Sequence, residues 1–127
     1  MEYKKEGTDD TPFVYFSKSE NILTIQGNSL PEEVTEFYTP IIEKLDAYLA
    51  DPNPVSQFVF KMFYFNSASS KIIFTIVELL NEAFKRGTNI GIKWMYEMDD
   101  DDMLDAGKSM EDYVEIPIEY EGFMEME

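Results

Sequence analysis

A run of eight mostly apolar residues, Phe58–Phe65, constrains the fold of this chain more than any other segment. The run is short and rich in aromatic residues, and it lacks the alternation of a half-exposed strand, which predicts a strand covered on both faces. It stops at Asn66 and the small residues Ser67–Ser70, and apolar residues then recur at helical spacing up to Phe84. These segments predict a central strand, a tight polar turn and a helix.

The rest of the chain predicts further strands and helices around this unit. Apolar runs bounded by turn residues predict strands, and an apolar stripe at helical spacing predicts a helix. Strands are expected at 13–16, 22–27, 58–65, 90–96 and 114–118, and helices at 31–50, 71–85 and 103–110. The first two strands form a hairpin, and the later strand–helix–strand order predicts parallel pairing with right-handed crossovers.

Four residues that interrupt regular structure refine these bounds. Pro31 suits the first position of the first helix, whereas Pro40 lies inside it and predicts a kink near Thr39. Gly87 is the expected stop of the second helix, and Pro117 makes the last strand an edge strand. The polar residues 1–11 and the tail 121–127 are expected to be flexible.

The predicted fold class is α/β. A mixed sheet of about five strands carries two main helices and a short third helix. The 127 residues are sized for a single domain over 1–127. No apolar run approaches the length of a membrane span, and residues 1–5 lead into no signal-like segment, so we expect a cytoplasmic protein.

Composition excludes several classes of function. The chain has no cysteine and no histidine, so disulfides, thiol catalysis, Cys/His zinc sites and imidazole bases are absent. Its net charge is -16, and residues 97–127 hold 13 of the 26 acidic residues but only one basic residue, Lys108. Such a surface repels nucleic acid and anionic lipid, and it favours either a partner with a basic face or no partner at all.

The serines that follow the central strand allow two interpretations. A serine at a helix N-terminus caps it by accepting a backbone N–H, a role that fits Ser69 or Ser70. Alternatively a serine on this turn is phosphorylated, because free N–H groups at a helix N-terminus stabilise a phosphate. A nucleophilic serine is excluded, because the chain lacks a histidine base and the turn is not Gly-x-Ser-x-Gly.

Other polar groups carry weaker signals. The run Asp99–Asp102 offers hard oxygen ligands for a cation, but consecutive residues rarely converge on one ion, and a solvated loop is the better interpretation. Glu78 and Glu82 lie one helical turn apart on the polar side of the second helix, where exposed residues or part of a partner-binding face are expected rather than acid–base catalysis. We expect no cofactor, metal or small-molecule substrate.

Several segments together resemble the SiaC family of bacterial regulatory phosphoproteins, over roughly residues 12–120. The Asn66–Ser70 turn is the most specific of them. The segments are Gly27-Asn28-Ser29-Leu30-Pro31-Glu32, Tyr64-Phe65-Asn66-Ser67-Ala68-Ser69-Ser70-Lys71, Leu79-Leu80-Asn81-Glu82-Ala83 and Ile92-Lys93-Trp94-Met95-Tyr96. The fold of this family resembles the STAS domains of anti-anti-sigma factors, which also present a phosphorylatable serine at a strand-to-helix turn.

The resemblance implies a partner switch rather than an enzyme. A serine/threonine kinase phosphorylates such a protein, a PP2C-type phosphatase reverses this, and the unphosphorylated form activates a diguanylate cyclase, which raises cyclic di-GMP and promotes biofilm. By position the phosphoacceptor is Ser67, with Ala68 where serine is more familiar. The cap and switch loop is Asn66, Ala68, Ser69 and Ser70, and the partner surface is Lys71, Thr75, Glu78 and Glu82.

Two alternatives to this function stay open. The first is an anti-anti-sigma-like antagonist that binds an anti-sigma-type kinase, and co-purification separates it from a cyclase activator by the partner retrieved. The second is a small enzyme that uses carboxylates alone, which would require buried, convergent Asp or Glu side chains.

Overall fold

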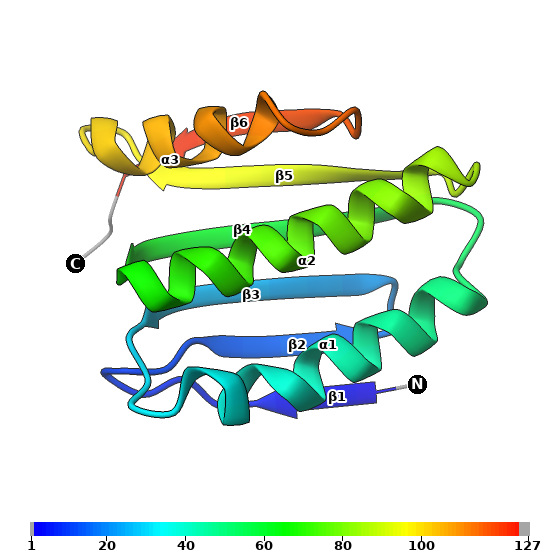
Figure 1. Cartoon of the computed structure of the whole chain (residues 1–127), viewed down its shortest axis with the longest axis horizontal. Coiled ribbons are helices and arrows are strands. Elements are labelled where there is room, and N and C mark those ends of the chain that lie inside the picture. The colour runs from blue at the N-terminus through cyan, green and yellow to red at the C-terminus, as the bar shows by residue number, and fades with distance from the viewer. Residues whose placement is uncertain (1, 125–127) are drawn as a thin grey trace.

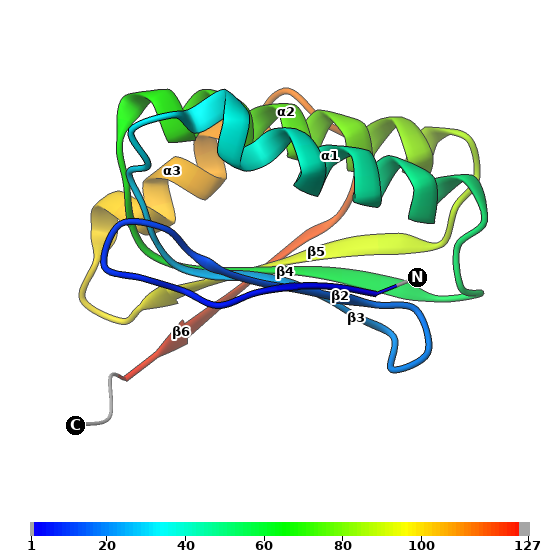
Figure 2. The same cartoon turned by 90° about the horizontal axis from the view of Figure 1, so that it is seen from below.

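The computed structural model describes residues 2–124. Along the chain the elements are β1 (Glu2–Lys5), β2 (Phe13–Ser17), β3 (Ile22–Ser29), α1 (Val34–Ala50), β4 (Ser56–Phe65), α2 (Ser67–Lys85), β5 (Ile90–Glu97), α3 (Asp101–Glu111) and β6 (Ile118–Phe123). The strands form one sheet, seen face-on behind the helices in Figure 1. All three helices lie on the same side of this sheet, so the molecule has two layers (Figure 2).

The strands are ordered in the sheet as they are in the chain, from β1 to β6. The pairs β1–β2 and β2–β3 are antiparallel, and β2–β3 is the predicted hairpin. The pairs β3–β4, β4–β5 and β5–β6 are parallel, and each is connected through one of the three helices. The predicted mixed α/β fold is therefore confirmed, with one strand more than expected.

The core lies between the helices and the covered face of the sheet. Phe58, Phe60 and Trp94 from the sheet are buried there, together with side chains from α1 and α2. The prediction that β4 is covered on both faces is wrong, because Gln57 and Phe63 are exposed on the opposite face. Successive residues of β4 alternate between buried and more exposed positions over most of its length. The sequence does not show this alternation, because apolar residues also occupy the open face.

Both predicted flexible ends contain strand. β1 pairs with β2 from Glu2 to Lys5, and the Tyr3 ring packs against Phe16 at 6.3 Å between centroids. The last strand begins at Ile118 rather than at 114 and includes Glu121 to Phe123, so the expected fraying of these residues is wrong, while residues 125–127 lie outside the described part. The segment 114–117 is a connection, and β6 is an edge strand as predicted.

The first helix begins later than predicted. β3 continues to Ser29, which pairs with Phe65, so Pro31 falls in the connection and α1 starts at Val34. The helix then runs through Pro40, and a kink near Thr39 stays a prediction. Across residues 2–124 we find no helix with the length and apolar character needed to cross a bilayer.

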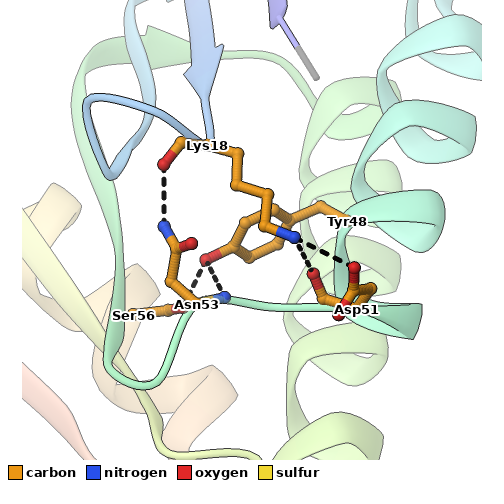
Figure 3. A network of polar contacts seen from close by, with 5 residues as sticks. All are labelled: Lys18, Tyr48, Asp51, Asn53 and Ser56. Carbon is orange, nitrogen blue, oxygen red and sulfur yellow. Dashed lines mark hydrogen bonds and ion pairs between the residues drawn. The ribbon is translucent and has the colours of Figure 1, made fainter.

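A polar network fixes the C-terminal end of α1 (Figure 3). The Tyr48 hydroxyl lies 2.5 Å from Ser56 Oγ, and it accepts the backbone N–H of Asn53. The Asn53 amide donates to the carbonyl of Lys18, whose ammonium binds the carbonyl and the carboxylate of Asp51. The network joins the α1–β4 connection to the β2–β3 turn. It lies at the start of β4, whereas Ser67 follows the end of this strand.

Candidate functional site

The predicted switch segment, Asn66–Ser70, lies where β4 passes into α2. β4 ends at Phe65, Asn66 is the N-cap residue, and Ser67 is the first residue of the helix. The Asn66 N–H donates to the carbonyl of Ser29 at 3.1 Å, so the end of β3 holds the turn from one side. The turn thus lies at the end of the sheet where the parallel strands β3 and β4 finish, as Figure 1 shows.

The cap of α2 is Asn66, a member of the predicted cap and switch loop, and not Ser69 or Ser70. The side chain of Asn66 accepts the backbone N–H of Ser69 at 2.9 Å, so Asn66 caps the helix and neither Ser69 nor Ser70 does. The Ser70 hydroxyl instead donates to the carbonyl of Ser67. The cap role of Ser69 and Ser70 was wrong because the chain enters the helix one residue before Ser67, where an asparagine is among the preferred caps.

Ser69 points into the protein. It is fully buried, and its oxygen accepts the hydroxyl of Ser29 at 2.8 Å. Ser29 Oγ also lies 2.6 Å from the hydroxyl oxygen of Tyr38 on α1, and all three side chains are buried. Burial raises the pKa of Tyr38 to about 12, against a smaller lowering by its Ser29 hydrogen bond. This hydroxyl cluster ties the first turn of α2 to β3 and α1.

Ser67 and Ala68 are exposed, whereas Ser69 is buried and Ser70 is half-buried. The backbone N–H groups of Ser67 and Ala68 donate to no acceptor in the described part of the chain, as expected for the first residues of a helix. Ser67 is therefore an accessible hydroxyl that bonds no neighbour through its side chain within residues 2–124. Its modification disturbs no packed group.

Two hollows flank this turn. The first, of about 370 Å³, lies between α2 and α3 and is mainly apolar. We call it the α2–α3 hollow, and its lining is Phe65, Ser70, Lys71, Phe74, Ala106, Ser109, Met110 and Tyr113. The second, of about 290 Å³, lies between the end of β4 and the start of α3, and it includes the exposed aromatic residues Phe63 and Tyr64 together with Asp100 and Asp102.

The residues predicted to form the partner surface share one face of α2. Lys71, Thr75, Glu78 and Glu82 are all exposed and follow one another at helical spacing. Lys71 is the member that reaches the α2–α3 hollow. Their role in binding stays a prediction.

The acidic residues of the described structure lie at its surface. No carboxylate is buried within residues 2–124, where the buried hydroxyl and amide groups belong to serines, Asn81, Tyr38 and Tyr48. Within the same range we find no group of three or more acidic side chains placed to hold a metal ion, and Asp100 caps α3 by accepting the N–H of Met103. The alternative of a carboxylate enzyme therefore gains no support from residues 2–124.

Comparison with known proteins identifies the family. The family model described as SiaC family regulatory phosphoprotein matches residues 5–122. The chain belongs to the SiaC family. An uncharacterized protein of Pseudomonas aeruginosa strain UCBPP-PA14 is 30% identical over 91 residues, which cover 72% of each protein. The matched range of the family model includes the whole predicted switch segment.

Solved SiaC structures share the fold of this SiaC family member. Apo-SiaC from Pseudomonas aeruginosa superimposes with a TM-score of 0.87 at 24% identity, covering 96% of this chain and 99% of that one. A second similar chain belongs to a crystal structure of the diguanylate cyclase SiaD in complex with its activator SiaC, from the same species. It matches with a TM-score of 0.89 at 23% identity, covering 95% of this chain and 99% of that one.

Sequence reasoning placed the turn correctly but missed the residues that support it. Ser29 and Tyr38 precede Ser69 by 40 and 31 positions, and no local pattern indicates that their hydroxyls meet. Tyr64, with 53% of its surface exposed, was assigned to a buried strand.

Proposed function

We propose that this SiaC family member is a cytoplasmic, non-enzymatic phosphoprotein that acts as a partner switch. A serine/threonine kinase phosphorylates Ser67, and a PP2C-type phosphatase removes the phosphate. The unphosphorylated form binds and activates a diguanylate cyclase, which raises cyclic di-GMP and promotes biofilm. The observation that carries the proposal is the exposure of Ser67 beside the buried Ser69, since only an accessible hydroxyl reaches a kinase. Family membership and the SiaD activator role named for a structural relative support it.

The switch works through local charge and size. A phosphoserine adds about 1.5 to 2 negative charges and three acceptor oxygens at neutral pH. On a chain whose net charge is already -16, this addition disfavours an acidic partner surface and the loss of water from the turn. The domain does not refold, because Asn66 and Ser69 hold the turn through bonds that leave Ser67 outside.

The partner surface consists of the exposed face of α2 and the α2–α3 hollow. Lys71, Thr75, Glu78 and Glu82 supply polar contacts along the helix. The hollow supplies apolar area from Phe65, Phe74 and Met110, and its lining also includes Ser70, three residues after the proposed phosphoacceptor. A partner bound there covers Ser67, so the phosphate clashes with the same complex that the apolar contacts stabilise.

Two measurements test this function. Phosphopeptide mapping across residues 62–71, after incubation with the kinase and ATP, should find phosphate on Ser67 in the wild type and none on this segment in Ser67→Ala. Calorimetry with the diguanylate cyclase should find weaker binding for Ser67→Asp and Ser67→Glu than for the wild type. Phosphate on another residue, or unchanged binding by both acidic variants, contradicts the proposal. Co-purification of a GHKL-type kinase instead of a cyclase supports the anti-anti-sigma alternative.

A further inference from the structure

The charges along α2 are unevenly placed. The helix carries four charged side chains, Lys71, Glu78, Glu82 and Lys85, so Lys71 is the only charge in its first eleven residues. Lys85 forms an ion pair with Glu82 at 3.8 Å. Lys71 is exposed and has neither an ion pair nor an aromatic ring below its ammonium within residues 2–124.

Acidic residues outnumber basic residues by 26 to 10 in this chain, and among the described lysines Lys44 and Lys71 are the two with neither an ion pair nor an aromatic ring below the ammonium. Within the described residues Lys4, Lys18, Lys85 and Lys93 form ion pairs, and Lys5, Lys61 and Lys108 lie over aromatic rings. No carboxylate lines the α2–α3 hollow on which Lys71 borders. The ammonium of Lys71 therefore has no described anion competing for it.

Lys71 follows Ser67 by four residues in the same helix. Side chains at this spacing are neighbours on the helix surface, with about 5–6 Å between their Cβ atoms. An anion placed four residues before a lysine is the favoured orientation of such a pair. A phosphate on Ser67 is an anion in this position, and its oxygens lie within reach of a flexible ammonium.

We propose that Lys71 is the internal counter-ion of phosphorylated Ser67, and that it holds the phosphate over the first turn of α2. This inference rests on the phosphorylation of Ser67 in the proposed function. The same pairing takes the Lys71 ammonium away from the edge of the α2–α3 hollow, where the unphosphorylated protein presents it to a partner. Phosphorylation then changes the surface in two ways. It adds the phosphate on Ser67, and it engages the Lys71 ammonium in an ion pair.

The test is a ³¹P NMR titration of protein that carries phosphoserine at position 67. The phosphoserine is installed during synthesis through an expanded genetic code, so no kinase is needed. An ion pair with Lys71 favours the dianion, and Lys71→Met should raise the second pKa of the phosphate by about 0.2–0.4 unit at low salt. Lys71→Arg should keep the pKa of the wild type. The difference should shrink in high salt, because the pair is exposed.

Lys44→Met is the matched control. Lys44 is an exposed lysine on α1 that also lacks an ion pair in the described structure, and its replacement removes the same charge far along the sequence from Ser67. The control should leave the phosphate pKa unchanged. Equal pKa values in the wild type and Lys71→Met, or equal shifts in Lys71→Met and Lys44→Met, overturn the pairing. Because the titration is independent of the kinase, a failed kinase assay overturns the proposed function alone.

Discussion

Replacing Ser67 and Ser69 of the switch segment by alanine should have different effects on stability and on phosphorylation. Ser69 is fully buried and bonded to Ser29, whereas Ser67 is exposed and its side chain bonds no described neighbour. Ser69→Ala should therefore lower stability without removing the phosphoacceptor. Ser67→Ala should remove the phosphoacceptor without lowering stability. Two residues of the same type, two positions apart, then report on the fold and on the switch independently.

The expected loss follows from the contacts of Ser69. Its removal breaks a buried hydrogen bond of 2.8 Å and leaves Ser29 with Tyr38 as its side-chain partner. The loss of one such bond, which leaves the buried Ser29 hydroxyl with one hydrogen-bond partner fewer, should lower the free energy of unfolding by about 1–2 kcal/mol. For a domain of this size that corresponds to a Tm about 4–8 °C lower. The exposed Ser67→Ala should stay within about 0.5 kcal/mol of the wild type.

Thermal unfolding followed by circular dichroism, together with urea unfolding, measures these differences. Ser70→Ala serves as the control within the same turn, because its hydroxyl bonds only the carbonyl of Ser67 from a half-buried position, and it should behave like Ser67→Ala. If Ser69→Ala unfolds at the wild-type temperature, or if Ser67→Ala is destabilised as strongly, the division between a structural and a signalling serine is refuted.

Three further predictions test other parts of the fold. Asn81→Leu should cost about 2–4 kcal/mol in urea unfolding, because the Asn81 carbonyl oxygen accepts two backbone N–H groups of the connection before β6. Gly107→Ala should lower stability by about 1–3 kcal/mol despite a better helix propensity, because a Cβ there lies 2.8 Å from the Trp94 ring. Folding raises the pKa of Tyr38 from 10.0 to about 12, so the folded state favours the neutral phenol. The contribution of this phenol to the free energy of unfolding is therefore fully present below pH 10, and it is lost as the pH rises through 12. The wild type should therefore lose about 2 kcal/mol more than Tyr38→Phe between pH 9 and pH 11.5 in urea midpoints.

Local sequence patterns predicted most elements but not all of their ends. The apolar run at Phe58–Phe65 and the stripe that follows it predicted the existence and the last residues of β4 and α2, because each is long and bounded by turn residues. Both elements begin earlier than predicted, β4 at Ser56 and α2 at Ser67. Gly87, with a φ of +105°, ends α2 as predicted. β1 was missed because three of its four residues are charged, and a strand of this kind forms only through its pairing with β2.

The sequence predicts where the candidate site lies, but it does not predict which of its serines is buried and which is exposed. Asn66 and the serines mark a strand-to-helix turn in any single sequence. Which serine is buried depends on the direction in which the turn leaves β4, and that is set by Ser29 on the neighbouring strand. Local residues therefore predict the turn but not which of its serines is buried, because the contact that decides this joins residues 40 positions apart.

The hydroxyl pairs at the two ends of α1 bear on how the switch acts. Tyr38, near the start of the helix, meets Ser29, and Tyr48, near its end, meets Ser56 (Figure 3). Each pair joins α1 to a strand of the sheet, and the first also reaches α2 through Ser69. Ser67 contributes no side chain to either pair, so on the proposed function we expect its phosphorylation to leave the helices in place. The proposed function then predicts a signal made by a changed surface on a domain of fixed structure, and it predicts that the partner contacts α2 within one turn of Ser67.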